Sequence, residues 1–257
     1  MRFLTYLAPS LPLGLFETIA VEVGRKLGIA TSLASETRVS GPLGGASDPF
    51  RRGEADVGFL CSPSYLWMRA QPAPAVELVP AAPLFADPRL AGRPVYFSDV
   101  IVRADAGVAS FAELRGGTFA YNDASSMSGY FSLLEKLRAI GAERFFAELR
   151  HAGSHLRSIE LVAAGEVSCA AIDSNVLRHR LSIDRSVARR VRVLESWGPF
   201  PIQPVVARTG LPAEMRARLA AALLSIDPQV LAPFGVARFV PVDEALYASS
   251  PARERAA

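Results

Sequence analysis

Apolar and polar positions along the chain alternate between two periods, and this alternation predicts an α/β fold. Short apolar runs typical of buried strands occupy residues 2–8, 118–122 and 169–173. Elsewhere apolar residues recur with the spacing of a helix that buries one face. The clearest example covers positions i, i+3, i+4, i+7 and i+11 and ends at Gly28: Phe16, Ile19, Ala20, Val23 and Leu27.

The same patterns assign the rest of the chain. Further strands are predicted at 31–38, 56–60, 96–103, 191–194, 203–208 and 237–242. Further helices are predicted at 48–52, from 62 onward, at 110–116, 128–140, 142–149, 156–164, 212–225 and 228–234. Strands and helices therefore follow one another along the chain, as they do in α/β proteins.

Two β-prone segments, near 97–104 and 199–206, stand out as candidate crossings between lobes. They bracket a stretch that has the pattern of a complete α/β unit. We therefore expect two lobes, one made of residues 1–102 and 199–257 and the other of residues 103–198. In such an organisation a ligand is expected in the cleft between the lobes.

Composition narrows the possible functions. The chain is 50% hydrophobic and 21% charged with a formal net charge of +3, which fits a folded protein with a sizeable core. Its basic residues are scattered among acids and apolar residues, so nucleic acid is not an expected partner. Cys61 and Cys169 lack metal-ligand spacing, so we expect neither a metal nor a cofactor. No apolar run is long enough to span a membrane.

The N-terminal segment affects the expected location. The apolar stretch at 2–8 is followed by Pro9 and Pro12 and is too short for the core of a signal peptide, so we interpret it as the first strand. If Met1 is the native start, the protein is expected in the cytoplasm. The alternative is that an export signal lies outside this sequence.

The most informative segment is residues 121–130, which follows a predicted strand and opens a predicted helix. Ser125, Ser126 and Ser128 place three hydroxyl groups where the first backbone N–H groups of a helix are unpaired, and Gly129 allows close approach. Such a helix start binds an anion without a lysine or arginine. The alternative is that one serine only caps the helix.

Two further loop-to-helix junctions each have a side chain that could bind a ligand. His155 could donate to an anion, and a pKa near neutrality would let it do so in either protonation state. Asp173 ends a buried strand and could accept a hydrogen bond from a protonated oxygen or from a ligand amine. The simpler interpretations are that the histidine is structural and that the aspartate caps the next helix.

Together these segments resemble the PhnD-like phosphate, phosphite and phosphonate-binding proteins of ABC importers. The resemblance is carried by residues 121–130, 151–162 and 169–175, and it continues through 96–103, 110–116 and 198–204. It covers most of the chain in the expected order. It implies a two-lobed fold of the type 2 periplasmic-binding-protein class, which closes around its ligand.

The resemblance also implies a binding site. In such proteins the anion rests on the serine-rich helix start, which here matches Ser126, Met127 and Ser128, and on groups that match His155 and Asp173. An aromatic residue of the first lobe also contacts the ligand, for which Tyr65 and Tyr96 are candidates. Ser10, at the first strand–helix junction, is a further candidate.

The expected function is therefore a monomeric, non-enzymatic solute-binding protein. It would capture a small phosphorus oxyanion and deliver it to an ABC permease, in the periplasm as the resemblance implies. The sequence shows no nucleophile elbow, zinc-protease or Walker motif. Two alternatives stay open: a cytoplasmic enzyme on the same fold, of the menaquinone- or thiamine-pathway type with His155 as a general base, and a ligand sensor.

Overall fold

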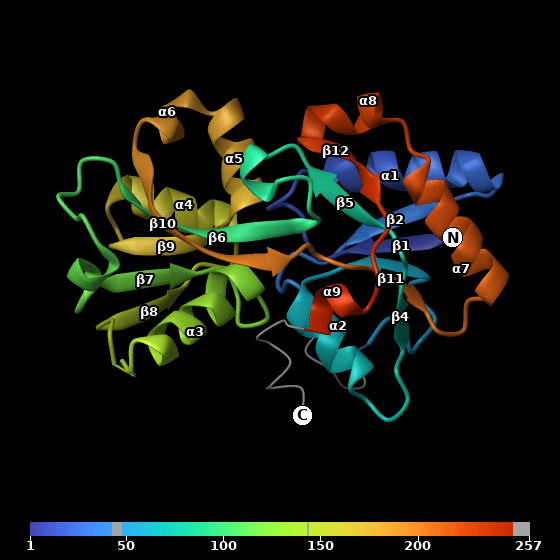
Figure 1. The fold of residues 1–257 in the computed structure, drawn as a ribbon, viewed down its shortest axis with the longest axis horizontal. Coiled ribbons are helices and arrows are strands. Elements are labelled where there is room, and N and C mark those ends of the chain that lie inside the picture. The colour runs from blue at the N-terminus through green and yellow to red at the C-terminus, as the bar shows by residue number, and fades with distance from the viewer. Residues whose placement is uncertain (43–47, 143, 249–257) are drawn as a thin grey trace. The chain divides into compact units, whose positions relative to one another are not determined.

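A computed structural model describes residues 1–42, 48–142 and 144–248. The chain divides into two compact units, and each is described by itself. Unit 1 comprises Met1–Val95 and Pro201–Ala257, and unit 2 comprises Tyr96–Phe200. Figure 1 gives the colour of each segment along the chain.

Unit 1 contains a mixed five-stranded sheet in the order β2-β1-β3-β11-β4. Its strands are β1 (Arg2–Thr5), β2 (Ser32–Ser35), β3 (Val57–Phe59), β4 (Val76–Leu78) and β11 (Val205–Arg208). Strand β1 runs parallel to β2 and β3, whereas β11 runs antiparallel to β3 and β4. A separate antiparallel pair joins β5 (Ala82–Phe85) and β12 (Val236–Val240).

The helices of unit 1 confirm the periodicity of the sequence. Helix α1 (Leu13–Leu27) buries Phe16, Ile19 and Val23 and ends at Gly28, which has a left-handed φ of 68°. The other helices are α2 (Ser62–Arg69), α7 (Ala213–Leu224), α8 (Pro228–Leu231) and α9 (Ala245–Ala248), with 3-10 turns at Pro88–Leu90 and Ala232–Phe234.

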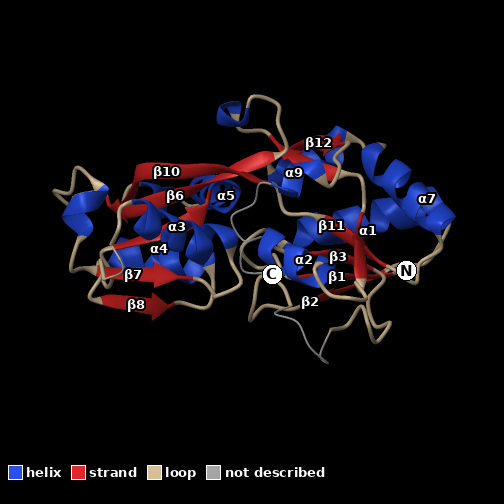
Figure 2. Cartoon of the chain, turned by 60° about the horizontal axis from the view of Figure 1, so that its bottom comes forward, coloured by secondary structure: helices blue, strands red, loops and turns tan. Residues whose placement is uncertain are grey.

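Unit 2 is built on a second five-stranded sheet, in the order β10-β6-β9-β7-β8. Its strands are β6 (Val95–Arg103), β7 (Thr118–Tyr121), β8 (Glu148–His151), β9 (Cys169–Asp173) and β10 (Val191–Pro201). Strand β7 runs parallel to both β8 and β9, and β6 runs antiparallel to β9. Figure 2 shows these strands in red among the blue helices of the unit.

The helices of unit 2 follow the parallel strands directly. A turn of π-helix (Met127–Phe131) continues into α3 (Ser132–Ala139), and α4 (His155–Ala164) and α5 (Ser174–Ile183) follow β8 and β9. Helix α6 (Arg185–Ala188) and a 3-10 turn (Phe111–Leu114) complete the unit. Figure 1 shows α3 and α4 on opposite sides of the sheet, as expected for an α/β layer structure.

An aromatic core holds α3 against this sheet. Phe111 stacks on Phe145 at a centroid distance of 4.8 Å and meets the edges of Phe146 and Trp197 at 5.9 and 5.4 Å. Leu133 of α3 belongs to the same buried cluster. Ring pairs of this geometry add to the stabilisation from burial alone.

Two predicted helices are wrong. Residues 48–52 form turns in which the Asp48 carboxylate accepts a hydrogen bond from the Phe50 N–H at 2.8 Å, a local bond that competes with helix formation. The helix predicted at 142–149 is also absent from its described residues, and its last two residues belong to strand β8, Glu148–His151. The backbone just before it is engaged by the turn before β7, since Gly116 N–H donates to the Phe145 carbonyl and Ala147 N–H donates to the Gly117 carbonyl. Tertiary pairing therefore overrides the local pattern.

The aromatic core yields a stability prediction. Phe111→Ala removes a side chain that is only 4% exposed, so we expect it to lower the free energy of unfolding of unit 2 by about 3–5 kcal/mol. Leu149→Ala, on the exposed face of β8, is the matched control and should change it by less than about 0.5 kcal/mol. Urea unfolding followed by circular dichroism measures the free energy of unfolding of both variants. Similar effects of the two substitutions would contradict the placement of Phe111 in the core of unit 2.

Candidate functional site

The predicted binding residues of unit 2 gather at one edge of its sheet. Strands β7, β8 and β9 are parallel, so their carboxyl ends and the helix starts that follow them lie on the same side. Strand β6 is antiparallel, and its register places Ser98 opposite Asp173 at this edge. The carboxyl edge of parallel strands is the usual ligand position in α/β proteins.

The serine turn between β7 and α3 is held by its own side chains. The Asp123 carboxylate accepts hydrogen bonds from the Ser125 N–H, at 2.8 Å, and from the Ser125 hydroxyl. Ser126 Oγ accepts from the Gly129 N–H at 3.1 Å and thus caps the turn. The structure therefore shows Ser126 in the capping role that the sequence analysis gave as the alternative. Met127, the next residue, is fully buried.

Ser128 connects the serine turn to the next helix start. Its hydroxyl lies 3.1 Å from His155 Nε2, and both side chains are buried. Its carbonyl accepts hydrogen bonds from the hydroxyls of Ser98, at 2.7 Å, and Ser132, at 2.6 Å. These two bonds fix the turn to strand β6 and to α3, and the sequence motifs did not single out either donor.

Gly129 is required by close packing at this point. A Cβ atom on it would lie 1.7 Å from Asn122 Oδ1 and 3.3 Å from His155 Cε1. The expected close approach is therefore present, but in this structure it is an approach of neighbouring side chains. A larger residue would displace the Asn122 side chain and press on the His155 ring.

His155 begins α4 and is shielded from solvent. Ser154 caps the helix by accepting a hydrogen bond from the Arg157 N–H at 3.1 Å. Burial lowers the pKa of His155 to about 4, and the opposing effect of the nearby Asp123 charge is smaller. The sequence-based expectation of a pKa near neutrality is therefore wrong, because desolvation favours the neutral ring. At pH 7 His155 is an uncharged imidazole, which donates one hydrogen bond and accepts another.

Asp173 ends β9 and caps α5. Its Oδ1 accepts hydrogen bonds from the N–H groups of Asn175 and Val176, at 2.7 and 3.4 Å. The capping role predicted as the simpler interpretation is thus present. The Asn175 side chain, two residues on, is also buried, and the sequence analysis did not select it. Its place within the segment 169–175 was the available signal.

The remaining candidates are Ser10 and Tyr65 in unit 1 and Tyr96 on strand β6 of unit 2. Tyr65, in unit 1, is fully buried, donates its hydroxyl to the Glu244 carboxylate and meets the Tyr247 ring edge-on at 5.3 Å. Tyr96, at the start of β6, is buried 6.1 Å from the Phe200 ring. Ser10 lies partly exposed in the turn after β1. Their roles in binding stay predictions.

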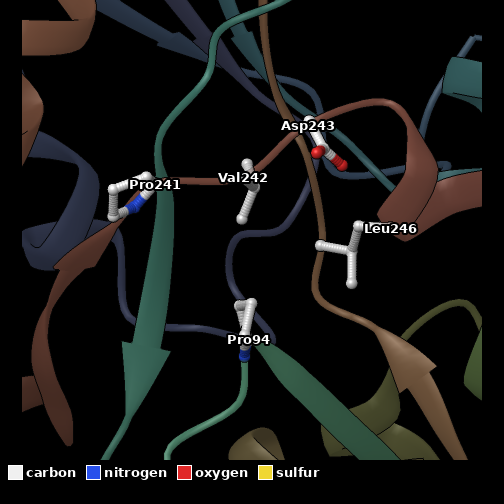
Figure 3. A pocket seen from close by; sticks show the side chains of 5 residues that line it. All are labelled: Pro94, Pro241, Val242, Asp243 and Leu246. Atoms are coloured by element: carbon white, nitrogen blue, oxygen red, sulfur yellow. The ribbon is translucent and has the colours of Figure 1, made fainter.

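Unit 1 also has a pocket of about 420 Å³, lined by Pro94, Pro241, Val242, Asp243 and Leu246 (Figure 3). Among the described residues that line it, the one charged side chain is the Asp243 carboxylate, which repels an anion. The pocket therefore lacks the chemistry expected of an oxyanion site. Over the described ranges, no cluster of three or more metal-ligating side chains occurs, and no helix is long and apolar enough to cross a membrane.

This two-unit α/β fold is shared by proteins of known structure. PhnD1 from Prochlorococcus marinus, solved in complex with methylphosphonate, superposes with a TM-score of 0.83 at 17% identity over 99% of this chain and 97% of that one. A binding protein of an ABC phosphonate transporter from Pseudomonas aeruginosa gives 0.79 at 18% identity, over 96% and 82%. A protein from Xanthomonas citri bound to ATP gives 0.71 at 20% identity, over 100% and 97%.

The fold is therefore of the two-lobed periplasmic-binding-protein type. The family model described as "ABC transporter, phosphonate, periplasmic substrate-binding protein" matches residues 19–247. The chain therefore belongs to this family of transport proteins, and the resemblance seen in the sequence is confirmed.

The low pKa of the buried His155 leads to a prediction of how the free energy of unfolding depends on pH. Its folded-state pKa of about 4 lies below the unfolded value near 6.5, so the unfolded chain binds this proton first as the pH falls. The free energy of unfolding should therefore drop between about pH 6.5 and pH 4, by at most about 3 kcal/mol from this residue.

His155→Gln should remove this component, whereas His151→Gln, at an exposed position on β8, should keep the wild-type slope. Denaturant titrations of the ligand-free proteins at a series of pH values measure the slopes. Equal slopes in His155→Gln and wild type would show that the histidine is not held neutral by burial.

Proposed function

We propose that this protein binds a small phosphorus oxyanion (phosphonate, phosphite or phosphate) at the carboxyl edge of the unit 2 sheet. The observation that carries the proposal is the hydrogen bond between Ser128 and His155, which joins two helix starts at that edge. Backbone N–H groups at such starts carry partial positive charge and favour an anion.

The donors proposed for the anion are uncharged. Ser126 and Ser128 supply hydroxyl groups, the backbone of the Met127 turn supplies N–H groups, and neutral His155 supplies a ring nitrogen. Ser125 supports this turn through Asp123. Hydrogen bonds to a charged ligand are stronger than neutral ones, so a few of them hold an anion without an arginine or lysine.

Asp173 adds selectivity in this proposal. Its carboxylate repels a fully ionised oxyanion and accepts a hydrogen bond from a protonated oxygen or from a ligand amine. Tyr96, Tyr65 and Ser10 stay candidate ligand contacts, as the family resemblance implies. The Tyr65 hydroxyl would have to exchange its bond to Glu244 for one to the ligand.

We further propose that the protein acts in transport as a non-catalytic monomer. Its partner would be the permease of an ABC importer, and its place of action the periplasm, as for the family to which it belongs. The neutral state of His155 argues against the enzyme alternative. A buried imidazole whose pKa is about 4 is a weak base near pH 7, where a general base works best with a pKa near that pH.

Single substitutions test the proposed site. Ser126→Ala and His155→Ala each remove one hydrogen bond to a charged ligand, so we expect affinity to fall roughly 10-fold to 100-fold. Isothermal titration calorimetry with phosphate, phosphite, methylphosphonate and 2-aminoethylphosphonate measures this, after unfolding and refolding to remove bound ligand. ATP belongs in the same series, because the Xanthomonas citri neighbour was solved with it.

The exposed Ser182→Ala substitution, on α5 of the same unit, is the matched control and should bind as the wild type does. Thermal unfolding establishes that each variant is folded, since Ser126 also caps its turn. Unchanged affinity in both site variants would rule out the proposed site. Slow chemical conversion of a bound ligand would favour the enzyme instead.

A further inference from the structure

Two neighbouring helix starts hold buried hydrogen-bonding atoms that the folded chain does not use. Among the described residues, His155 Nδ1 at the start of α4 has no hydrogen-bond partner, and neither does Nδ2 or Oδ1 of Asn175 at the start of α5. Helices α4 and α5 pack against each other. Both side chains are at least nine-tenths buried, with exposed fractions of 5% and 3%.

The fold itself does not account for the Asn175 amide. The cap of α5 uses the backbone N–H of Asn175, which donates to Asp173 Oδ1, and leaves the side chain out. The next two residues, Val176 and Leu177, are buried and apolar, so this part of the helix accepts apolar side chains. A buried amide with both ends unpaired is destabilising, so the Asn175 side chain calls for a partner that the folded chain does not supply.

The chemistry of the amide narrows that role. The NH₂ end donates hydrogen bonds and the oxygen end only accepts them. A fully ionised oxyanion has acceptors alone, so it would satisfy Nδ2 and leave Oδ1 unpaired. A ligand that carries a hydrogen beside its oxyanion satisfies both ends at once.

We infer that Asn175 is a specificity-determining residue that selects ligands carrying a hydrogen-bond donor next to the oxyanion. The donor is either a protonated phosphorus oxygen or an ammonium group. The Asp173 carboxylate, on the adjacent turn, disfavours a ligand without such a hydrogen. The inference rests on the proposed function and adds to it the residue that separates ligands of equal charge and similar shape.

Methylphosphonate and methanesulfonate form the first pair of probes. The singly charged form of each has a methyl group and three oxygens, but only methylphosphonate carries a hydrogen on oxygen. We expect the wild type to bind methylphosphonate at least about tenfold more tightly than methanesulfonate in calorimetry. This comparison needs no substitution, so it is independent of how any variant folds.

Variants then assign the selectivity to Asn175. Asn175→Leu removes both ends of the amide at similar volume and should weaken methylphosphonate binding about tenfold or more while narrowing its advantage over methanesulfonate. Gln229→Leu, which removes an exposed amide from α8, is the matched control and should leave both affinities unchanged.

2-Aminoethylphosphonate separates the two sources of the hydrogen. If the phosphorus oxygen supplies it, Asn175→Leu weakens this ligand and methylphosphonate alike. If the ammonium group supplies it, the wild type prefers 2-aminoethylphosphonate and Asn175→Leu weakens that ligand alone, in which case methylphosphonate shows no tenfold advantage over methanesulfonate.

Other results overturn the inference. Equal wild-type affinities for all three ligands, or an Asn175→Leu variant that binds as the wild type does, would show that the amide does not select the ligand, while oxyanion binding itself would stand. A wild-type protein that binds none of the phosphorus oxyanions would instead overturn the proposed function, and this inference with it.

Discussion

The parallel pairing of β7 with β8 and β9 is the constraint on which the candidate site depends. It turns three strand–helix junctions, far apart in the sequence, toward one edge of the sheet. Each junction then presents a helix start, with its partial positive charge, to the same region. The antiparallel β6 adds Ser98 at that edge, and its hydroxyl fixes the serine turn through the Ser128 carbonyl.

Much of this fold could be predicted because local signals and tertiary packing agree. Gly28 and Gly165 end α1 and α4 in the left-handed conformation that glycine favours, and the buried apolar run at Cys169–Asp173 forms a central strand. The prediction of secondary structure failed where the local signals and the tertiary packing disagree. Residues 148–151 have no strong strand pattern, and they become an edge strand only because β7 offers a partner.

The site was predictable to the extent that its residues follow strands. Ser126, Ser128, His155 and Asp173 were selected for standing at strand–helix junctions, and the structure places them at one edge. Burial was not visible in the sequence, so the low pKa of His155 was missed. Asn175 and Ser98 were missed for a related reason, since the burial of a polar residue and its neighbours in space are not visible in the sequence.

In the proposed site, the electrostatics of this edge would favour selectivity over strength of binding. A buried arginine would attract any anion. Neutral donors and helix starts bind well only a ligand whose oxygens lie within hydrogen-bond distance of those donors. The buried carboxylates of Asp123 and Asp173 then work against excess negative charge. The neutral state of His155 fits the same proposal, because a charged imidazolium would offset those carboxylates and weaken the proposed discrimination. Under the proposal that the protein distinguishes oxyanions differing by one substituent, such a site would serve it better than a strongly cationic one.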